Sequence, residues 1–179
     1  YATLLWVIEN ARNLNIDPAT IGVAGDSAGA NLASAVAIKA RDNQIPLAFQ
    51  LLIYPCNDRD FTTDSYLNCA TGYGLSTQAM QWFWDQYLQG DHHDDNPYAV
   101  PMKAKTFKDI APAIIITAQY DPLLSDSQKY GELLERDGVS VTYKEYAGMI
   151  HGFFSNLAVT PTARVAIDSA AAEIKRITQ

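Results

Sequence analysis

The sequence is poor in several features that would place it in a specialised class of protein. It contains two cysteines in 179 residues, Cys56 and Cys69, which are too few for a disulfide framework and lack metal-ligand spacing. No apolar stretch approaches the roughly 18 residues that a membrane-spanning helix needs. Acidic side chains outnumber basic ones by 20 to 13, for a net charge of −7, which argues against binding to nucleic acid or to an anionic membrane. We therefore expect no nucleic-acid partner and no membrane span.

What remains is the composition of a globular domain, with 48% hydrophobic and 18% charged residues. At this length we expect one domain with a sizeable core. The chain starts at Tyr1, without a methionine or signal peptide, and Leu4, Leu5, Ile8 and Ala11 recur at helical spacing from the outset. This start predicts that the sequence is a piece of a longer protein. The scarcity of cysteine favours a cytoplasmic location.

Predicted strands and helices alternate along the chain, which indicates βαβ units and a mostly parallel sheet with helices on both faces. A long excursion, residues 56–111, separates the second strand from the third and is rich in Asp, Tyr and Trp. We expect strands at Ile21–Gly25, Phe49–Tyr54, Ala113–Thr117 and Val139–Tyr146. We expect a first helix that runs from the start of the chain and ends near Asn13 to Asn15, and further helices at Ala28–Asn43, Gln78–Leu88, Ser125–Arg136 and from Thr160 onward.

The most informative motif is Gly25-Asp26-Ser27-Ala28-Gly29, between an apolar strand and an alanine-rich helix. In a strand–turn–helix context, G-x-S-x-G forms a nucleophile elbow, a sharp turn that exposes the serine. The flanking glycines lack Cβ atoms, so strand and helix can approach closely. Chance alone gives the bare pattern in roughly 3% of sequences of this composition. The assignment therefore depends on finding partners for Ser27.

Candidate partners follow other predicted strands, where an open parallel sheet carries its reactive side chains. Ser27, Asp121 and His151 follow the first, third and fourth strands, in the chain order of the α/β-hydrolase arrangement. Asp126 competes with Asp121, but it falls in the first turn of a helix, where a carboxylate favours the helix dipole. Asp26 adjoins Ser27 and points in the wrong direction for the acid. We therefore predict a catalytic triad of Ser27, Asp121 and His151.

The other two histidines lie in an acidic segment. His92, His93, Asp94 and Asp95 could form a metal site, but adjacent side chains point apart and no distant cluster supports one. A solvated acidic loop is the better interpretation. We expect no metal ion and no cofactor.

Together, these motifs resemble those of a hormone-sensitive-lipase-like carboxylesterase, bacterial family IV of the α/β-hydrolases, over its carboxyl-terminal half. The resemblance implies hydrolysis of short- to medium-chain acyl esters, a small-molecule substrate, with Ser27 as nucleophile, His151 as general base and Asp121 as the acid that orients it. The backbone N–H of Ala28 would then donate to the oxyanion. The segments that carry the resemblance are Gly25–Gly29, Tyr54-Pro55, Asn96-Pro97-Tyr98-Ala99, Tyr120-Asp121-Pro122-Leu123 and His151-Gly152-Phe153.

The resemblance also implies two parts that these 179 residues do not contain. One is an HGGG-type loop upstream of the elbow, which supplies most of the oxyanion hole, and the other is an amino-terminal cap. The resemblance therefore implies that residues 1–179 are a partial catalytic domain without its first strands, and that it is weak or inactive alone. The strand at 21–25 would then present an unpaired edge.

The substrate pocket is expected to be lined by the excursion, because such pockets are mainly apolar. Tyr73, Leu75, Trp82 and Trp84 are the candidate pocket residues, and core packing is the alternative for the aromatic helix. Two other functions stay open: a peptidase or amidase on the same fold, and a non-catalytic small-molecule receptor. The presence of His151 argues against the receptor.

Overall fold

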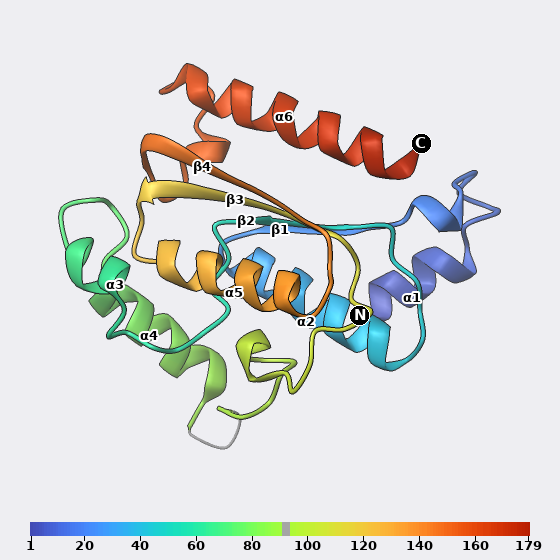
Figure 1. Ribbon diagram of the computed structural model, residues 1–179, viewed down its shortest axis with the longest axis horizontal. Helices are drawn as coiled ribbons and strands as arrows, with labels where there is room; N and C mark the ends of the chain where they lie inside the picture. Colours follow the sequence, from blue (N-terminus) through green and yellow to red (C-terminus); the bar gives the residue numbers. More distant parts are fainter. Residues whose placement is uncertain (91–93) are drawn as a thin grey trace.

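The computed structural model describes residues 1–90 and 94–179, which form a parallel four-stranded sheet between helices (Figure 1). All neighbouring strands pair in parallel, so their carboxyl ends lie along one edge. The predicted parallel α/β architecture is confirmed. In sheet order the strands are β1 (Val23–Asp26), β2 (Gln50–Ile53), β3 (Ala113–Tyr120) and β4 (Val141–Ile150).

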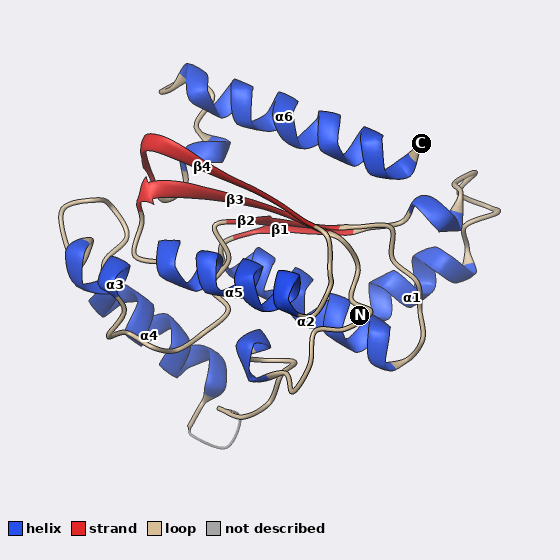
Figure 2. Cartoon of the chain, viewed as in Figure 1, coloured by secondary structure: helices blue, strands red, loops and turns tan. Residues whose placement is uncertain are grey.

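Both faces of the sheet are covered by helices, α2 (Ala28–Asp42), α5 (Leu124–Arg136) and α6 (Pro161–Thr178). Helices α2 and α5 are packed on one side and the long helix α6 on the other (Figures 1 and 2). Leu52 and Ile115 pack with the first pair, whereas Leu51 and Ile114 pack with the long helix. This division follows from the alternation of side chains along a strand, and both strands read as continuous apolar runs because both faces are covered.

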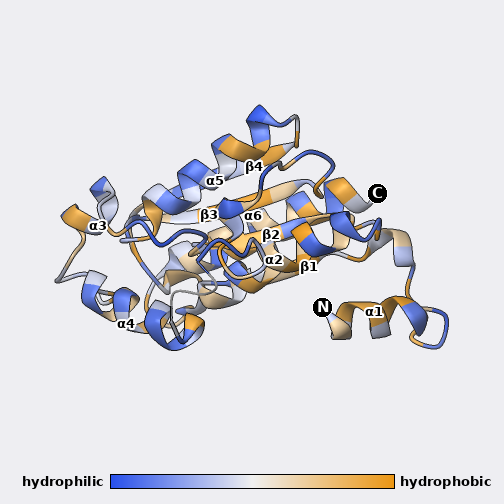
Figure 3. Ribbon diagram, turned by 90° about the horizontal axis from the view of Figure 1, so that it is seen from below, coloured by the Kyte–Doolittle hydropathy of each residue, from blue (hydrophilic) through white to orange (hydrophobic). Residues whose placement is uncertain are grey.

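The other described helices lie at the margins of the sheet. Hydrophilic and hydrophobic residues alternate along α5, as expected of a helix with one buried face (Figure 3). None of the helices in the described part of the chain is long and apolar enough to cross a bilayer. The remaining helical elements are α1 (Ala2–Glu9), α3 (Asp64–Asn68), α4 (Thr77–Leu88) and the 3₁₀ turns at Pro18–Thr20, Pro101–Lys103 and Phe153–Ser155.

Helix α1 is shorter than the sequence pattern predicts, because it ends at Glu9 rather than at Asn13–Asn15. The side-chain amide of Asn10 donates to the carbonyl oxygen of Trp6 at 2.8 Å. Such local bonds from asparagine to the backbone compete with continuation of a helix. The short helix α3 was not predicted.

Strands β3 and β4 are longer than predicted, since they run on past Thr117 and Tyr146. Their register shifts between Ala118 and Tyr120. A β-bulge of this kind interrupts the alternating pattern from which strand length was read. Strand β1 lies at one edge of the sheet formed by the described residues, as predicted for the strand before the elbow.

Two buried amides hold the excursion against α2. The side chain of Asn31 donates to the carbonyl oxygens of Cys56, at 2.8 Å, and Ala99, at 3.1 Å. The amide of Asn57 donates to Ser34 Oγ at 3.0 Å. Because buried polar groups are costly unless paired, these bonds fix where the excursion leaves and rejoins the core.

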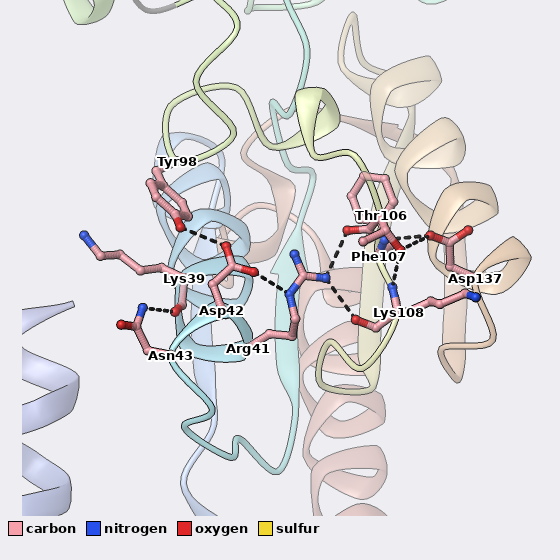
Figure 4. Close-up of polar contacts among 9 residues, drawn as sticks. All are labelled: Lys39, Arg41, Asp42, Asn43, Tyr98, Thr106, Phe107, Lys108 and Asp137. Atoms are coloured by element: carbon pink, nitrogen blue, oxygen red, sulfur yellow. Dashed lines mark hydrogen bonds and ion pairs between the residues drawn. The ribbon is translucent and has the colours of Figure 1, made fainter.

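The last part of the excursion is held between the ends of α2 and α5 (Figure 4). Arg41 Nη1 donates to the carbonyl oxygens of Thr106, at 3.0 Å, and Lys108, at 2.9 Å. The carboxylate of Asp137 accepts from Thr106 Oγ1 at 3.0 Å and from the Phe107 N–H at 2.6 Å. These bonds set the position from which the chain enters β3.

Replacing Asp137 by Asn should lower stability in a pH-dependent way. The Phe107 N–H, followed by the Arg136 guanidinium, lowers the pKa of the Asp137 carboxyl. A depressed folded-state pKa gives stability that is present above the unfolded value, about 3.9, and is lost as the pH falls through the folded value. We expect Asp137→Asn to lower Tm at pH 7, and the difference to shrink below about pH 4, as measured by circular dichroism.

Glu135→Gln is the matched control, because it removes one exposed negative charge from the same helical turn. It should not lower Tm at pH 7. An equal loss for Asp137→Asn at both pH values would show that the carboxylate charge has no part in holding the segment.

Candidate active site

Ser27 lies in the turn between β1 and α2, with a strained backbone. Its φ of 54° and ψ of −120° fall in a sparsely populated region for a residue with a Cβ, which costs about 1–3 kcal/mol. The Ser27 N–H donates to the carbonyl oxygen of Ile53 in β2 at 2.9 Å. The turn is thereby fixed to the neighbouring strand, and the serine side chain is presented at the carboxyl edge of the sheet, as at a nucleophile elbow.

The two glycines of the motif have different roles. A Cβ built on Gly25 would lie 2.2 Å from the backbone carbon and oxygen of Gly29, whereas a Cβ on Gly29 meets none of the described atoms within 4 Å. Close approach of strand and helix therefore requires glycine at position 25 alone. The expectation that both glycines serve this approach is corrected at Gly29, because the space beside it is open.

His151 lies between Asp121 and Ser27 at the carboxyl edge. Its Nδ1 is 2.7 Å from Asp121 Oδ2, and its Nε2 is 2.9 Å from Ser27 Oγ. Asp121 is fully buried, and its Oδ1 accepts from the Leu123 N–H at 2.9 Å. The carboxylate is thus held from both sides. The structure brings the three predicted residues into one chain of hydrogen bonds.

The bulge at the ends of β3 and β4 positions the histidine. Ala118 pairs with Tyr146, but Tyr120 pairs with Ile150, so β4 contains extra residues at this point. One of them, Gly148, has a φ of 74° and donates its N–H to Gln119 Oε1 at 2.8 Å. The bulge was missed in the sequence, although a glycine inside a strand pattern is a usual signal for one.

Asp126, the rejected candidate for the acid, has a different environment from the one predicted. It lies in the first turn of α5 as expected, but it is only 2% exposed. Burial, followed by the charge of Asp58, raises its pKa well above the ordinary aspartate value. Desolvation therefore outweighs the favourable helix dipole. Asp126 takes no part in the hydrogen bonds that link Ser27, His151 and Asp121.

A cavity of about 490 Å³ opens beside Ser27. Most of its wall comes from the excursion, as the predicted role of residues 56–111 requires, and Leu75 and Trp84 are both part of it. Met80 and Tyr87 lie on the same face of α4 as Trp84, at the spacing of one helical turn. They were not predicted, although this spacing could have identified them. The excursion side chains lining the cavity include Cys56, Leu75, Met80, Phe83, Trp84 and Tyr87.

Two of the predicted pocket residues lie elsewhere. Trp82 is 57% exposed, because residues two apart on a helix point in nearly opposite directions and Trp84 faces the cavity. The ring of Tyr73 stacks on that of Tyr120, with centroids 5.1 Å apart and 4° between the planes, in a separate hollow of about 330 Å³. Neither side chain lines the cavity beside Ser27.

No group of three or more His, Cys, Asp or Glu side chains in the described part of the chain could hold a metal ion. His92 and His93 lie outside the described residues, so the alternative of a metal site there stays open.

A parallel α/β sheet with a serine elbow, an acid and a histidine at its carboxyl edge defines the α/β-hydrolase class. The family described as having the alpha/beta hydrolase fold matches residues 1–155. The chain therefore belongs to this family, and the predicted relationship to its hormone-sensitive-lipase-like carboxylesterases is confirmed.

Named relatives and solved structures agree with this assignment. Carboxylesterase NlhH of Mycobacterium tuberculosis is 37% identical over 180 residues, which cover 98% of this chain and 56% of the relative. The ethyl acetate hydrolase of Pseudomonas putida is 31% identical over 150 residues, covering 83% and 47%. The crystal structure of EstE1, a thermostable carboxylesterase from a metagenomic library, superposes with a TM-score of 0.95 at 36% identity, covering 100% and 62%. The chain thus spans about half the length of these relatives.

Replacing Gly25 by alanine should destabilise the fold, because the added methyl group would collide with helix backbone that cannot give way. We expect a loss of about 1–3 kcal/mol or more, measured by urea unfolding.

Gly29→Ala is the matched control in the same motif. Its methyl group enters open space, and alanine is favoured in a helix by up to about 1 kcal/mol, so stability should hold or rise. If the two variants lost the same stability, the close approach at Gly25 would not be the cause.

Proposed function

We propose that Ser27, His151 and Asp121 are the catalytic triad of a serine carboxylesterase. The observation that carries the proposal is the unbroken chain of contacts, 2.9 Å from Ser27 Oγ to His151 Nε2 and 2.7 Å from His151 Nδ1 to Asp121 Oδ2. In this arrangement Nδ1–H donates to the buried carboxylate, and the lone pair of Nε2 faces the serine. Such a histidine can take the proton of the nucleophile.

The reaction would proceed through an acyl-enzyme. Ser27 Oγ attacks the ester carbonyl while Nε2 of His151 takes its proton, and the developing oxyanion accepts from the Ala28 N–H. The imidazolium, stabilised by Asp121, then gives the proton to the departing alcohol as the C–O bond breaks. Water, deprotonated by the same nitrogen, attacks the acyl-serine, releases the carboxylic acid and restores the serine hydroxyl.

The substrates we propose are small-molecule esters of short- to medium-chain acids. The cavity beside Ser27 is lined mainly by apolar side chains and has a volume of about 490 Å³, in the range of small-molecule sites. The ethyl acetate hydrolase among the relatives supports the short end of this range.

We infer that the 179 residues alone hydrolyse esters weakly. The oxyanion donors that the family resemblance assigns to an HGGG-type loop are not in this sequence. Loss of a single oxyanion donor lowers kcat by about 10²–10³-fold in a well-studied protease. Strand β1 lies at the edge of the sheet formed by the described residues, and an edge strand favours aggregation.

Ser27→Ala should abolish ester hydrolysis in the longer protein that the resemblance implies. We expect kcat for p-nitrophenyl butyrate to fall by about 10⁴-fold or more, because nothing replaces the nucleophile. Ser140→Ala, at an exposed serine distant from the site, should have no effect. The 179-residue chain should show little of the full activity, and strong turnover that depends on Ser27 would contradict that inference.

The same preparation distinguishes the alternative functions. Faster cleavage of a matched peptide amide than of the ester would make the protein an amidase or peptidase. Failure of the wild type to react with a fluorophosphonate would indicate a receptor, since a competent triad is acylated by this probe.

Trp84→Ala should shift the acyl-chain preference toward longer esters. Trp84 is almost fully buried and forms part of the cavity wall, so truncation enlarges the cavity. We expect the ratio of kcat/KM for the octanoate ester to kcat/KM for the butyrate ester to rise by about 10-fold. This is the discrimination that one or two methylene groups give in an apolar pocket. Trp82→Ala removes the same side chain from the exposed face of α4 and is the control. An unchanged ratio for Trp84→Ala would remove this residue from the pocket.

A further inference from the structure

We propose that Tyr54 is a positioning residue for His151, an inference that rests on the proposed triad. Tyr54 directly follows β2, and its side chain is 1% exposed. The centroid of its ring lies 4.4 Å from that of the His151 imidazole, with 54° between the planes. The tyrosine therefore contacts the catalytic ring directly, from a strand that supplies none of the three triad residues.

The backbone of Tyr54 is held in an unusual conformation. Its φ is 39°, a region that bulky residues rarely adopt. The Tyr54 N–H donates to the carbonyl oxygen of Ile116 in β3, and the preceding carbonyl, that of Ile53, accepts from the Ser27 N–H. Strain of this kind persists where the surroundings over-determine it, and it clusters at functional sites. Two neighbouring strand ends thus carry strained residues, and both residues contact His151.

The Tyr54 ring also contacts a second aromatic side chain, that of Phe153. Phe153, two residues after His151, meets it edge-on with centroids 6.2 Å apart, and Phe153 also packs on Tyr146 at 5.3 Å. These rings belong to the apolar core between the sheet and α6. Tyr54 is therefore held by the core and can transmit that rigidity to the imidazole.

Such a contact supplies a restraint that the hydrogen bonds of the histidine do not. The bonds to Asp121 and Ser27 are made at Nδ1 and Nε2, so they act mainly within the plane of the imidazole ring. A rigid ring packed against the imidazole opposes its displacement out of that plane. Because burial and the charge of Asp26 raise the pKa of Tyr54 to about 12, the phenol stays neutral and contributes packing rather than proton transfer.

The test compares Tyr54→Leu with Tyr54→Phe in the full-length protein, using p-nitrophenyl butyrate. Loss of the ring should lower kcat by about 10–100-fold, as expected when a catalytic group is misplaced, and leave KM within about twofold because Tyr54 does not line the substrate cavity. The rate of fluorophosphonate labelling of Ser27 should fall in parallel. Tyr54→Phe keeps the ring and should restore most of kcat and of the labelling rate.

Phe107→Leu is the control for lost packing, since Phe107 is a fully buried aromatic residue on the opposite face of the sheet. It should lower Tm and leave kcat unchanged. If Tyr54→Leu does not fold, Tyr54→Met replaces it, because methionine fills the volume flexibly without a rigid ring, and the same results are expected.

Three outcomes would overturn the proposal: a folded Tyr54 variant without the ring that keeps its kcat, a Tyr54→Phe variant as slow as Tyr54→Leu, or a Phe107→Leu variant that loses kcat equally. A wild-type protein without esterase activity would instead refute the proposed function. The two failures are therefore distinguishable.

Discussion

The parallel pairing of four strands is the constraint on which the site depends. It brings the carboxyl ends of β1, β3 and β4 to one edge, and residues separated by 124 positions in the sequence come within 2.9 Å of each other there. Strand β2 contributes none of the Ser27, His151 and Asp121 side chains, yet its last carbonyl accepts the Ser27 N–H. That hydrogen bond extends the pairing of β1 with β2 to the strained turn itself.

Strain and rigidity are linked in this edge of the sheet. The positive φ angles of Ser27 and Tyr54 are unfavourable by about 1–3 kcal/mol each, and stability from elsewhere must offset them. The apolar strands, covered by α2 and α5 on one face and α6 on the other, provide it. A buried carboxylate such as Asp121 is likewise tolerable only because both of its oxygens are hydrogen-bonded.

The sequence predicts the elements that carry chemistry better than the contacts that orient them. Ser27, Asp121 and His151 each follow a predicted strand, a local pattern that the parallel topology converts into proximity. Gly148 is a local signal for the bulge before His151, but its position depends on the pairing of β4 with β3. The burial of Asp126 depends on packing between distant segments, so no local pattern contains it. Trp82 and Trp84 are the same residue type in the same helix, so composition does not distinguish them. The orientation of α4 decides which of them lines the cavity.

The excursion is anchored through its backbone carbonyl oxygens, whereas its apolar side chains line the cavity. Hydrogen bonds to Asn31 and Arg41 of α2 fix its two ends to the core, whereas its middle presents Met80, Trp84 and Tyr87 to the cavity. Asn31 and Cys56 of the first anchor also line the cavity, whereas Met80, Trp84 and Tyr87 make none of these anchoring hydrogen bonds. Changes at those three side chains can therefore alter the cavity wall without removing the attachment. The parallel sheet thus positions Ser27, Asp121 and His151, whereas most of the wall of the neighbouring cavity comes from the excursion.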